Sequence, residues 1–175
     1  MHLQKDLVIN NRTIDYQGVF RFDELRSIIN KVLENQNYAK REKKIEEIVT
    51  EAGRKTYLEI RPYKKLTDEV TLMINIKITL NNVVETIEEV QSAKKKFEKG
   101  KIHIAFDSWI LTDYEHRWRL RPWVYFMKGI YNKYIFNTST AGGHRSELVS
   151  DTAYIYNQIK KLLNSYKVKA GKIKT

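Results

Sequence analysis

The chain is 175 residues long, with 42% hydrophobic residues, 11% aromatic residues and a formal net charge of +11. This length and hydrophobic content predict one folded domain with a substantial core, and they exclude a disordered chain. The sequence has no cysteine, which excludes disulfides, thiolate zinc sites and cysteine nucleophiles. No apolar run is long enough for a signal peptide or a membrane span, so we expect a cytoplasmic protein.

The first strands are expected between Leu7 and Phe20, with a tight turn at Asn10-Asn11 because asparagine tolerates a positive φ. A helix is expected next, with Asp23 as its N-cap and its end at residues 35–37. Apolar residues recur in it at helical spacing, which predicts one stripe packed on a sheet: Leu25, Ile28, Ile29, Val32 and Leu33.

Residues from Arg41 to Leu80 are expected to form strands. A hairpin turn is predicted at residues 52–54, and Pro62 should end the strand before it. From Val70 to Leu80 apolar and polar residues alternate with a period of two, which predicts a strand with one buried and one wet face.

Asn81-Asn82 is the next predicted turn, and a strand from Val83 to Val90 should follow it. We expect residues 93–100, which are rich in lysine, to form a charged connection. The last strand is predicted from Lys101 to Glu115. Because both of its faces carry apolar residues, it should lie in the centre of the sheet.

Two helices are expected after the sheet. The first begins at Arg121-Pro122, since proline suits the first helical position. The second runs from Ser146 to about Tyr166, after a loop of small residues at 138–146, and residues 167–175 should form a mobile basic tail. The prediction is an α+β domain over residues 1–166, with an antiparallel sheet of about six strands, one helix after the N-terminal strands and two C-terminal helices packed on the sheet.

The order strand, helix, antiparallel meander and long C-terminal helix resembles that of helix-grip domains, the START-like superfamily. This resemblance implies a curved sheet that wraps around a helix and often encloses an apolar cavity. Residues 100–136 are also similar to uncharacterised archaeal α+β proteins, which implies a fold but no activity. The second likeness rests on Asp113-Tyr114-Glu115, Trp118, Phe126, Gly129-Ile130-Tyr131 and Lys133-Tyr134-Ile135.

The positive charge is concentrated in the last third of the chain. From Arg117 onward there are 12 Lys and Arg residues but only two acids, Glu147 and Asp151, so this third carries +10 of the total of +11. A lysine-rich composition can raise the total charge of any protein, but it does not explain this uneven distribution. The asymmetry indicates either composition bias or a basic surface for an anionic partner.

Arginines and aromatic residues are interleaved in the stretch from Arg117 to Phe136, a pattern that suits phosphate contacts and base stacking. The same pattern suits a membrane surface, and the helical spacing of the aromatics also fits a buried core face. We expect a non-enzymatic domain that binds an anionic macromolecule, with nucleic acid as the first candidate. The predicted contacts are Arg117, Arg119, Arg121, Lys128, Arg145, Lys160 and Lys161.

Other binding modes stay open. An apolar small molecule could occupy a pocket, as in a carrier or sensor, lined by Phe106, Trp109, Trp123 and Phe126. The aromatic helix could instead be an interface of an assembly protein. The loop at 138–146 could hold an anion ahead of a helix, but it lacks the Gly-Lys-Ser/Thr ending of a phosphate loop.

No motif for catalysis or metal binding is apparent. The four histidines lack the spacing of metal ligands, and no serine stands in a Gly-x-Ser-x-Gly elbow. Asp113 and Glu115 beside His116 fit a solvated strand end as well as an acid–base pair. We therefore expect no cofactor and no metal; enzymatic activity is disfavoured, although residues far apart in sequence could still assemble a site.

Overall fold

The computed structural model describes residues 3–40, 42–51, 53–90, 93–113 and 140–172. The described elements are β1 (Leu3–Phe20), α1 (Phe22–Asn35), β2 (Glu42–Thr50), β3 (Gly53–Ile60), β4 (Tyr63–Lys65), β5 (Val70–Val90), β6 (Ala93–Asp113) and α3 (Thr140–Lys172). The strands form one antiparallel six-stranded sheet in the order β1-β6-β5-β3-β2, with β4 paired to β5. The α+β class and the antiparallel sheet are as the sequence predicted.

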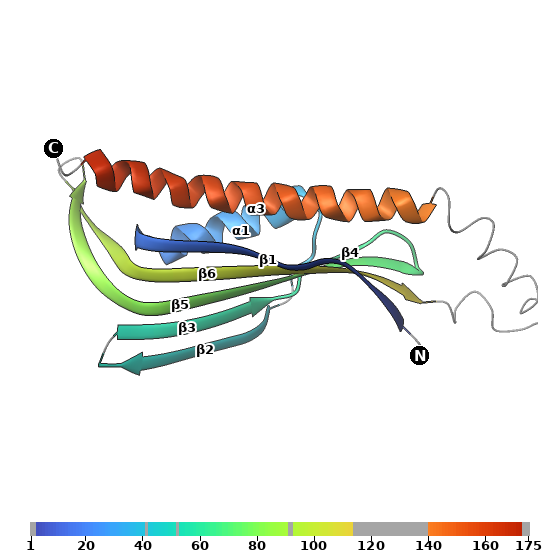
Figure 1. Cartoon of the computed structure of the whole chain (residues 1–175), viewed down its shortest axis with the longest axis horizontal. Coiled ribbons are helices and arrows are strands. Elements are labelled where there is room, and N and C mark those ends of the chain that lie inside the picture. Colours follow the sequence, from blue (N-terminus) through green and yellow to red (C-terminus); the bar gives the residue numbers. More distant parts are fainter. Residues whose placement is uncertain (1–2, 41, 52, 91–92, 114–139, 173–175) are drawn as a thin grey trace, which may run out of the picture.

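Both described helices lie on one side of the sheet (Figure 1). The long helix α3 runs along this side over β1 and β6, with α1 beside it, and β2 lies at the edge farthest from α3. Neither described helix combines sufficient length with sufficient apolar sequence to cross a membrane.

The core lies between the helices and the sheet. The buried face predicted for β5 is confirmed, because its five inward-facing side chains are 1% exposed or less: Leu72, Ile74, Ile76, Ile78 and Leu80. The other face is not wet throughout as predicted, since Asn75 on it is also only 1% exposed. A register slip of one residue would turn this whole row into water, so the pairing of β5 is strongly specified. The stripe of α1 is also confirmed, with Leu25, Ile29, Val32 and Leu33 buried and Ile28 packed against them.

The two Asn-Asn pairs form irregularities within strands, not turns. Asn11 and Asn82 have positive φ angles of 49° and 53°, yet β1 and β5 continue through them, with register shifts beside both sites. The predicted turns at 10–11 and 81–82 were therefore wrong. Asparagine does adopt the left-handed conformation there, but the neighbouring strand continues past each site, so the extra residue forms a bulge.

The lysine-rich segment that was predicted as a connection is also part of a strand. Residues 93–100 belong to β6 and pair with the end of β5, so the two strands form one long hairpin. In this register residues 88 and 89 pair with residues 95 and 94. The hairpin curls toward the C-terminal end of α3 (Figure 1).

The helix boundaries differ from those expected. Arg21, not Asp23, is the N-cap of α1, and Asp23 lies in the first turn, where its negative charge still suits the helix dipole. Helix α3 begins at Thr140, so most of the loop predicted at 138–146 is helical, and it continues through most of the predicted tail to Lys172. The helix expected from Arg121 lies outside the described residues.

Candidate functional site

The outward face of α3 carries exposed cations. The inward face is fixed by a seam of buried residues that pack on the sheet and on α1, which comprises Leu148, Ile155, Ile159, Leu162 and Tyr166. Lys160, Lys161 and Lys167 therefore project into solvent, and none of them forms an ion pair with a described residue. Asn157 precedes Lys160 by one turn, and Asn164 lies between Lys161 and Lys167. Both asparagines lie on the same stripe as the lysines, because residues three, four and seven apart share a helical face.

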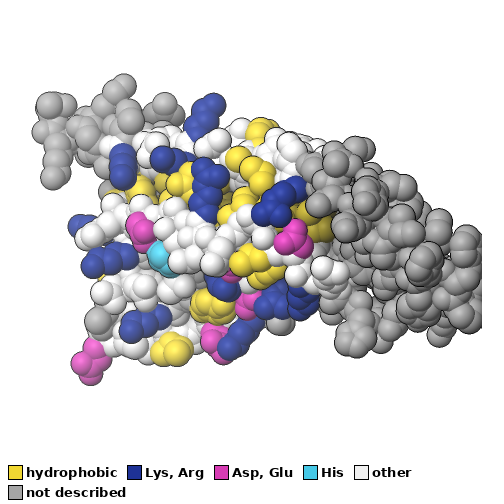
Figure 2. Space-filling view, turned by 45° about the vertical axis from the view of Figure 1, so that its right-hand side comes forward, with side chains coloured by type: hydrophobic (Ala, Val, Ile, Leu, Met, Phe, Trp, Pro, Cys, Tyr) yellow, Lys and Arg dark blue, Asp and Glu magenta, His cyan; other side chains and the backbone are white. Residues whose placement is uncertain are grey.

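Both acids of α3 are turned toward the sheet. Lys64 of β4 lies 2.7 Å from Glu147 and 3.5 Å from Asp151, measured from its Nζ to the nearest carboxylate oxygen. Among the α3 side chains that the structure describes, the exposed charged ones are therefore all cationic: Arg145, Lys160, Lys161 and Lys167. Figure 2 shows Lys and Arg side chains along the upper part of the molecule, where α3 lies.

Two tyrosines lie beside these cations on the side toward β1. The guanidinium of Arg12 lies 4.1 Å from the ring centre of Tyr156, and Nζ of Lys160 lies 5.9 Å from the same ring. Nζ of Lys167 lies 5.7 Å from the ring centre of Tyr16. Cation–π contacts of this kind hold the cations at the surface without neutralising them. We call Arg12, Lys160, Lys161 and Lys167 the basic strip.

A buried hydrogen-bonded cluster fixes the orientation of α3. The hydroxyl of Tyr38 donates to Asp151 Oδ2 at 3.0 Å, and both residues are less than 9% exposed. Burial, together with the charge of Asp151, raises the pKa of Tyr38 above its usual value. Partial burial lowers the pKa of Lys64, but the hydrogen bond to Glu147 and the charge of Asp151 outweigh it, so the net shift is upward. This cluster joins α3 to β4 and to the segment after α1.

A second such contact joins the two helices near the other end of α3. The hydroxyl of Tyr166 donates to a carboxylate oxygen of Glu24 in α1. Burial and this hydrogen bond raise the pKa of Tyr166. With Tyr38 bonded at the other end of α3, the helix is held at two points, which fixes the direction in which the basic strip faces.

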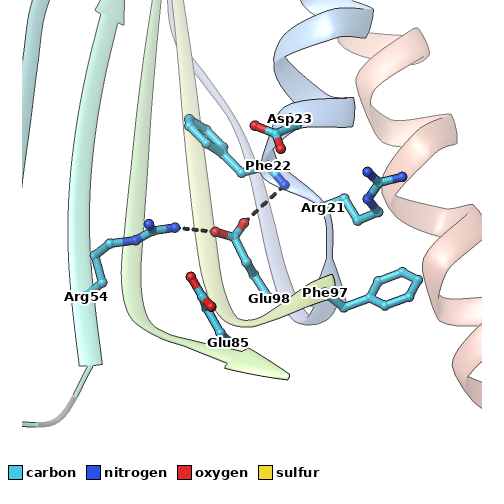
Figure 3. A pocket seen from close by; sticks show the side chains of 7 residues that line it. All are labelled: Arg21, Phe22, Asp23, Arg54, Glu85, Phe97 and Glu98. Atoms are coloured by element: carbon cyan, nitrogen blue, oxygen red, sulfur yellow. Dashed lines mark hydrogen bonds and ion pairs between the residues drawn. The ribbon is translucent and has the colours of Figure 1, made fainter. Parts of the chain in front are cut away.

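A pocket of about 490 Å³ opens beside the N-terminus of α1 (Figure 3). Glu98 stands at its centre: one carboxylate oxygen accepts the N–H of Phe22 at 3.1 Å, and the other binds the guanidinium of Arg54. The other lining residues are Arg21, Asp23, Glu85 and Phe97. Because five of the seven lining side chains are charged, this pocket is unlike the mostly apolar sites that hold apolar ligands.

Several polar side chains on the sheet face away from the helices pair with one another. Lys77 Nζ lies 2.9 Å from Asp107 Oδ2, and this hydrogen bond raises the pKa of Lys77. No group of three or more His, Asp or Glu side chains that could hold a metal ion occurs in the described part of the chain. Two further pairs lie on this face, Arg61–Glu59 at 2.8 Å and His103–Asp15 at 2.6 Å.

The structure separates the described residues of the predicted apolar pocket. Phe106 is fully buried under α3, with its ring centre 5.8 Å from that of Tyr156. Trp109 is half-buried and points to the opposite face of β6, because side chains three residues apart in a strand face opposite ways. Trp123 and Phe126 lie outside the described residues, so Phe106 and Trp109 do not line one pocket here.

The predicted anion contacts fall into two groups. Arg145, Lys160 and Lys161 are exposed on α3, and Arg145 is paired with Asp6 at 3.1 Å. Arg12 and Lys167 were not among the predicted contacts; the seven-residue spacing from Lys160 could have identified Lys167. The remaining predicted contacts lie outside the described residues: Arg117, Arg119, Arg121 and Lys128.

Comparisons with known proteins add little. No family model and no curated protein matches this chain. One solved structure, an uncharacterised protein from Rhizobium leguminosarum, matches with a TM-score of 0.27 and 6% sequence identity over 94% of this chain and 99% of that one. Because the TM-score is this low, we carry nothing over from that protein.

Proposed function

We propose that this protein is a non-enzymatic domain that binds nucleic acid through the basic strip formed by α3 and Arg12 of β1. The observation that supports the proposal is the separation of charge on this helix: its acids face Lys64, and its exposed charges are all positive. An anionic partner that approaches α3 therefore meets Lys160, Lys161 and Lys167 with no acid of the same helix among them.

The dimensions of the strip suit a chain of phosphates better than a single anion. Lys160 and Lys167 are two turns apart, which is about 10 Å at a rise of 1.5 Å per residue. Asn164 lies between the lysines and Asn157 lies one turn before them, and both can donate hydrogen bonds to phosphate, sugar or base edges. In this proposal the arginines at 117, 119 and 121 add further phosphate contacts. The proposal also includes a cytoplasmic location.

The finer architecture that we infer is helix-grip-like. A long C-terminal helix lies along a curved antiparallel sheet, and the first helix follows the first strand, which is the element order of such domains. A carrier of an apolar molecule is the weaker alternative, since Phe106 is packed against Tyr156 and the pocket at Glu98 is charged.

The test is binding to single-stranded RNA and to duplex DNA between about 50 and 200 mM salt, because each neutralised phosphate adds about 0.7 (single strand) or 0.9 (duplex) to the slope of log affinity against log salt. In the variant Lys160→Gln/Lys161→Gln/Lys167→Gln we expect the slope to fall by about 2 on single-stranded RNA. A change of this size would assign three phosphate contacts to the strip.

A matched control removes the same charge elsewhere. Lys5, Lys55 and Lys101 are exposed on strands, away from the outward face of α3, and their replacement by Gln lowers the net charge by the same amount. We expect this control to keep the wild-type slope. Equal losses in both variants would assign the binding to net charge alone, and an absence of salt-dependent binding would refute the proposal.

A further inference from the structure

Strand β2 leaves one edge of the sheet open. It pairs only with β3, so among the described strands nothing covers its other side. Three of its apolar side chains are unusually exposed for their type: Ile45 at 53%, Ile48 at 61% and Val49 at 79%. A sheet edge of this kind presents unpaired backbone N–H and C=O groups, on which another strand can add.

The opposite edge of the sheet is protected in two ways. Strand β1 has register shifts between Leu7 and Ile9 and between Ile9 and Arg12, and α3 lies against it. Bulges and a covering helix both prevent pairing with a further strand. In β2, by contrast, the only register shift lies between Glu42 and Lys44, and the stretch from Lys44 to Thr50 is regular.

The regular part of β2 is complementary to itself around Ile45, which stands between Lys44 and Glu46. When two such strands run antiparallel with Ile45 opposite Ile45, Lys44 of each strand stands opposite Glu46 of the other. Opposite charges and apolar pairs at facing positions stabilise antiparallel strands, whereas like charges destabilise them.

We propose that two copies of this chain pair through β2 about a two-fold axis at Ile45 and so form one continuous antiparallel sheet. Within one strand Lys44 Nζ lies 2.7 Å from Glu46 Oε1. In the pair, Lys44 of each copy would also face Glu46 of the other copy, so the four side chains would form one cluster of alternating charge. A two-fold axis gives both copies the same contacts, and this self-complementary pattern meets that requirement.

The charge pattern also sets the register. A shift of the axis by one residue places Glu46 opposite Glu46, or Lys44 opposite Lys44, and sets Ile45 against a charged residue. Charged residues on an edge usually prevent strand addition. Here they disfavour the two neighbouring registers relative to the one centred on Ile45, so they act as a device for specificity.

The paired arrangement leaves the basic strip free. Strand β2 lies at the edge of the sheet farthest from α3 (Figure 1), so a second copy added there does not cover the outward face of the helix. One pair of strands is a small interface, so we expect reversible association rather than an obligate dimer.

The test is the mass of the full-length protein by sedimentation velocity from about 1 to 200 µM, since the dimer fraction depends on protein concentration. We expect the wild-type protein to shift from monomer to dimer over this range. Lys44→Glu and Glu46→Lys should each weaken the dimer at least tenfold, because each creates like-charge pairs across the axis. The two changes alter the net charge in opposite directions, so a loss in both cannot arise from net charge.

The double variant Lys44→Glu/Glu46→Lys is the matched control, because the swapped charges are again complementary across the axis. We expect it to dimerise as the wild type does. A wild-type protein that stays monomeric at all concentrations, or single variants that dimerise normally, would overturn the proposal. So would a folded double variant, checked by circular dichroism, that does not dimerise.

A cross-linking experiment tests the register independently. The chain contains no cysteine, so a single introduced one can form a disulfide only with another copy. Facing residues of antiparallel strands lie within disulfide distance. Ile45→Cys should give a covalent dimer under mild oxidation, and Glu47→Cys should not, because the two copies of residue 47 lie on opposite sides of the axis, four positions apart along the strands. The reverse result would exclude the register centred on Ile45.

Discussion

Replacement of Tyr38 by Phe tests whether the buried cluster holds α3 on the sheet. The change removes one hydroxyl, which donates to Asp151 Oδ2 at 3.0 Å, and leaves the ring in place. A hydrogen bond to a charged group contributes about 1.5–3 kcal/mol, so we expect a loss of that size in the free energy of unfolding at pH 7. For a chain of this length the loss corresponds to a fall in Tm of roughly 3–12 °C.

The same variant should behave differently at alkaline pH. Burial and Asp151 raise the pKa of Tyr38 in the folded state above its ordinary value of 10.0. Above that value the unfolded chain releases the phenolic proton while the folded protein keeps it, so the stabilisation is present below pH 10 and is lost as the pH rises. We therefore expect the difference between wild type and variant to shrink by about 1.4 kcal/mol per pH unit above pH 10.

Urea unfolding at pH 7, 10 and 11, followed by circular dichroism, measures these differences. Tyr154→Phe is the matched control, since Tyr154 lies on the same helix, is 39% exposed and makes no hydrogen bond to a described residue. We expect a change within about 0.5 kcal/mol for this control at all three pH values. If Tyr38→Phe behaves like Tyr154→Phe, the cluster does not hold α3.

Two further predictions concern packing and backbone conformation. Phe106→Ala should lower the free energy of unfolding, measured in urea, by about 3–5 kcal/mol, because its side chain is fully buried. Trp109→Ala, at a half-buried position, should lower it by less. An equal loss in the two variants would contradict the assignment of the core to the helix side. Gly53→Ala should destabilise by about 1–3 kcal/mol, because φ is +119° and a Cβ would lie 3.0 Å from backbone atoms of residues 82 and 83. Gly143→Ala, where a Cβ in α3 meets nothing within 4 Å, should instead stabilise by about 0.5–1 kcal/mol.

The parts of the fold that were predicted correctly are those with a local signal. The alternation from Val70 to Leu80, the stripe of α1 and the strand end at Pro62 each follow from residues close together in sequence. The two Asn-Asn pairs show where such a signal fails. A left-handed asparagine suits both a hairpin turn and a bulge, and only the presence of a continuing partner strand distinguishes the two.

The candidate binding face was predicted only in part, because some of its features follow from local spacing and others depend on contacts between distant residues. Lys160 and Lys161 were identified from charge and helical spacing, and both are exposed. The positions of Glu147 and Asp151 could not be predicted, because their partner Lys64 lies more than 80 residues away in the chain. Without that contact, the sequence did not show that the two acids would face the sheet.

The sequence by itself determined the α+β class, the buried rows of β5 and α1, and the excess of positive charge in the last third of the chain. These properties depend on residue type and on short periodic spacing, which act before any long-range contact forms. The tertiary structure alone decided the length of the β5–β6 hairpin, the direction in which α3 presents its lysines, and which strand edge is left open. Each of these depends on pairing between segments far apart in the chain, and local spacing carries no information about such pairing.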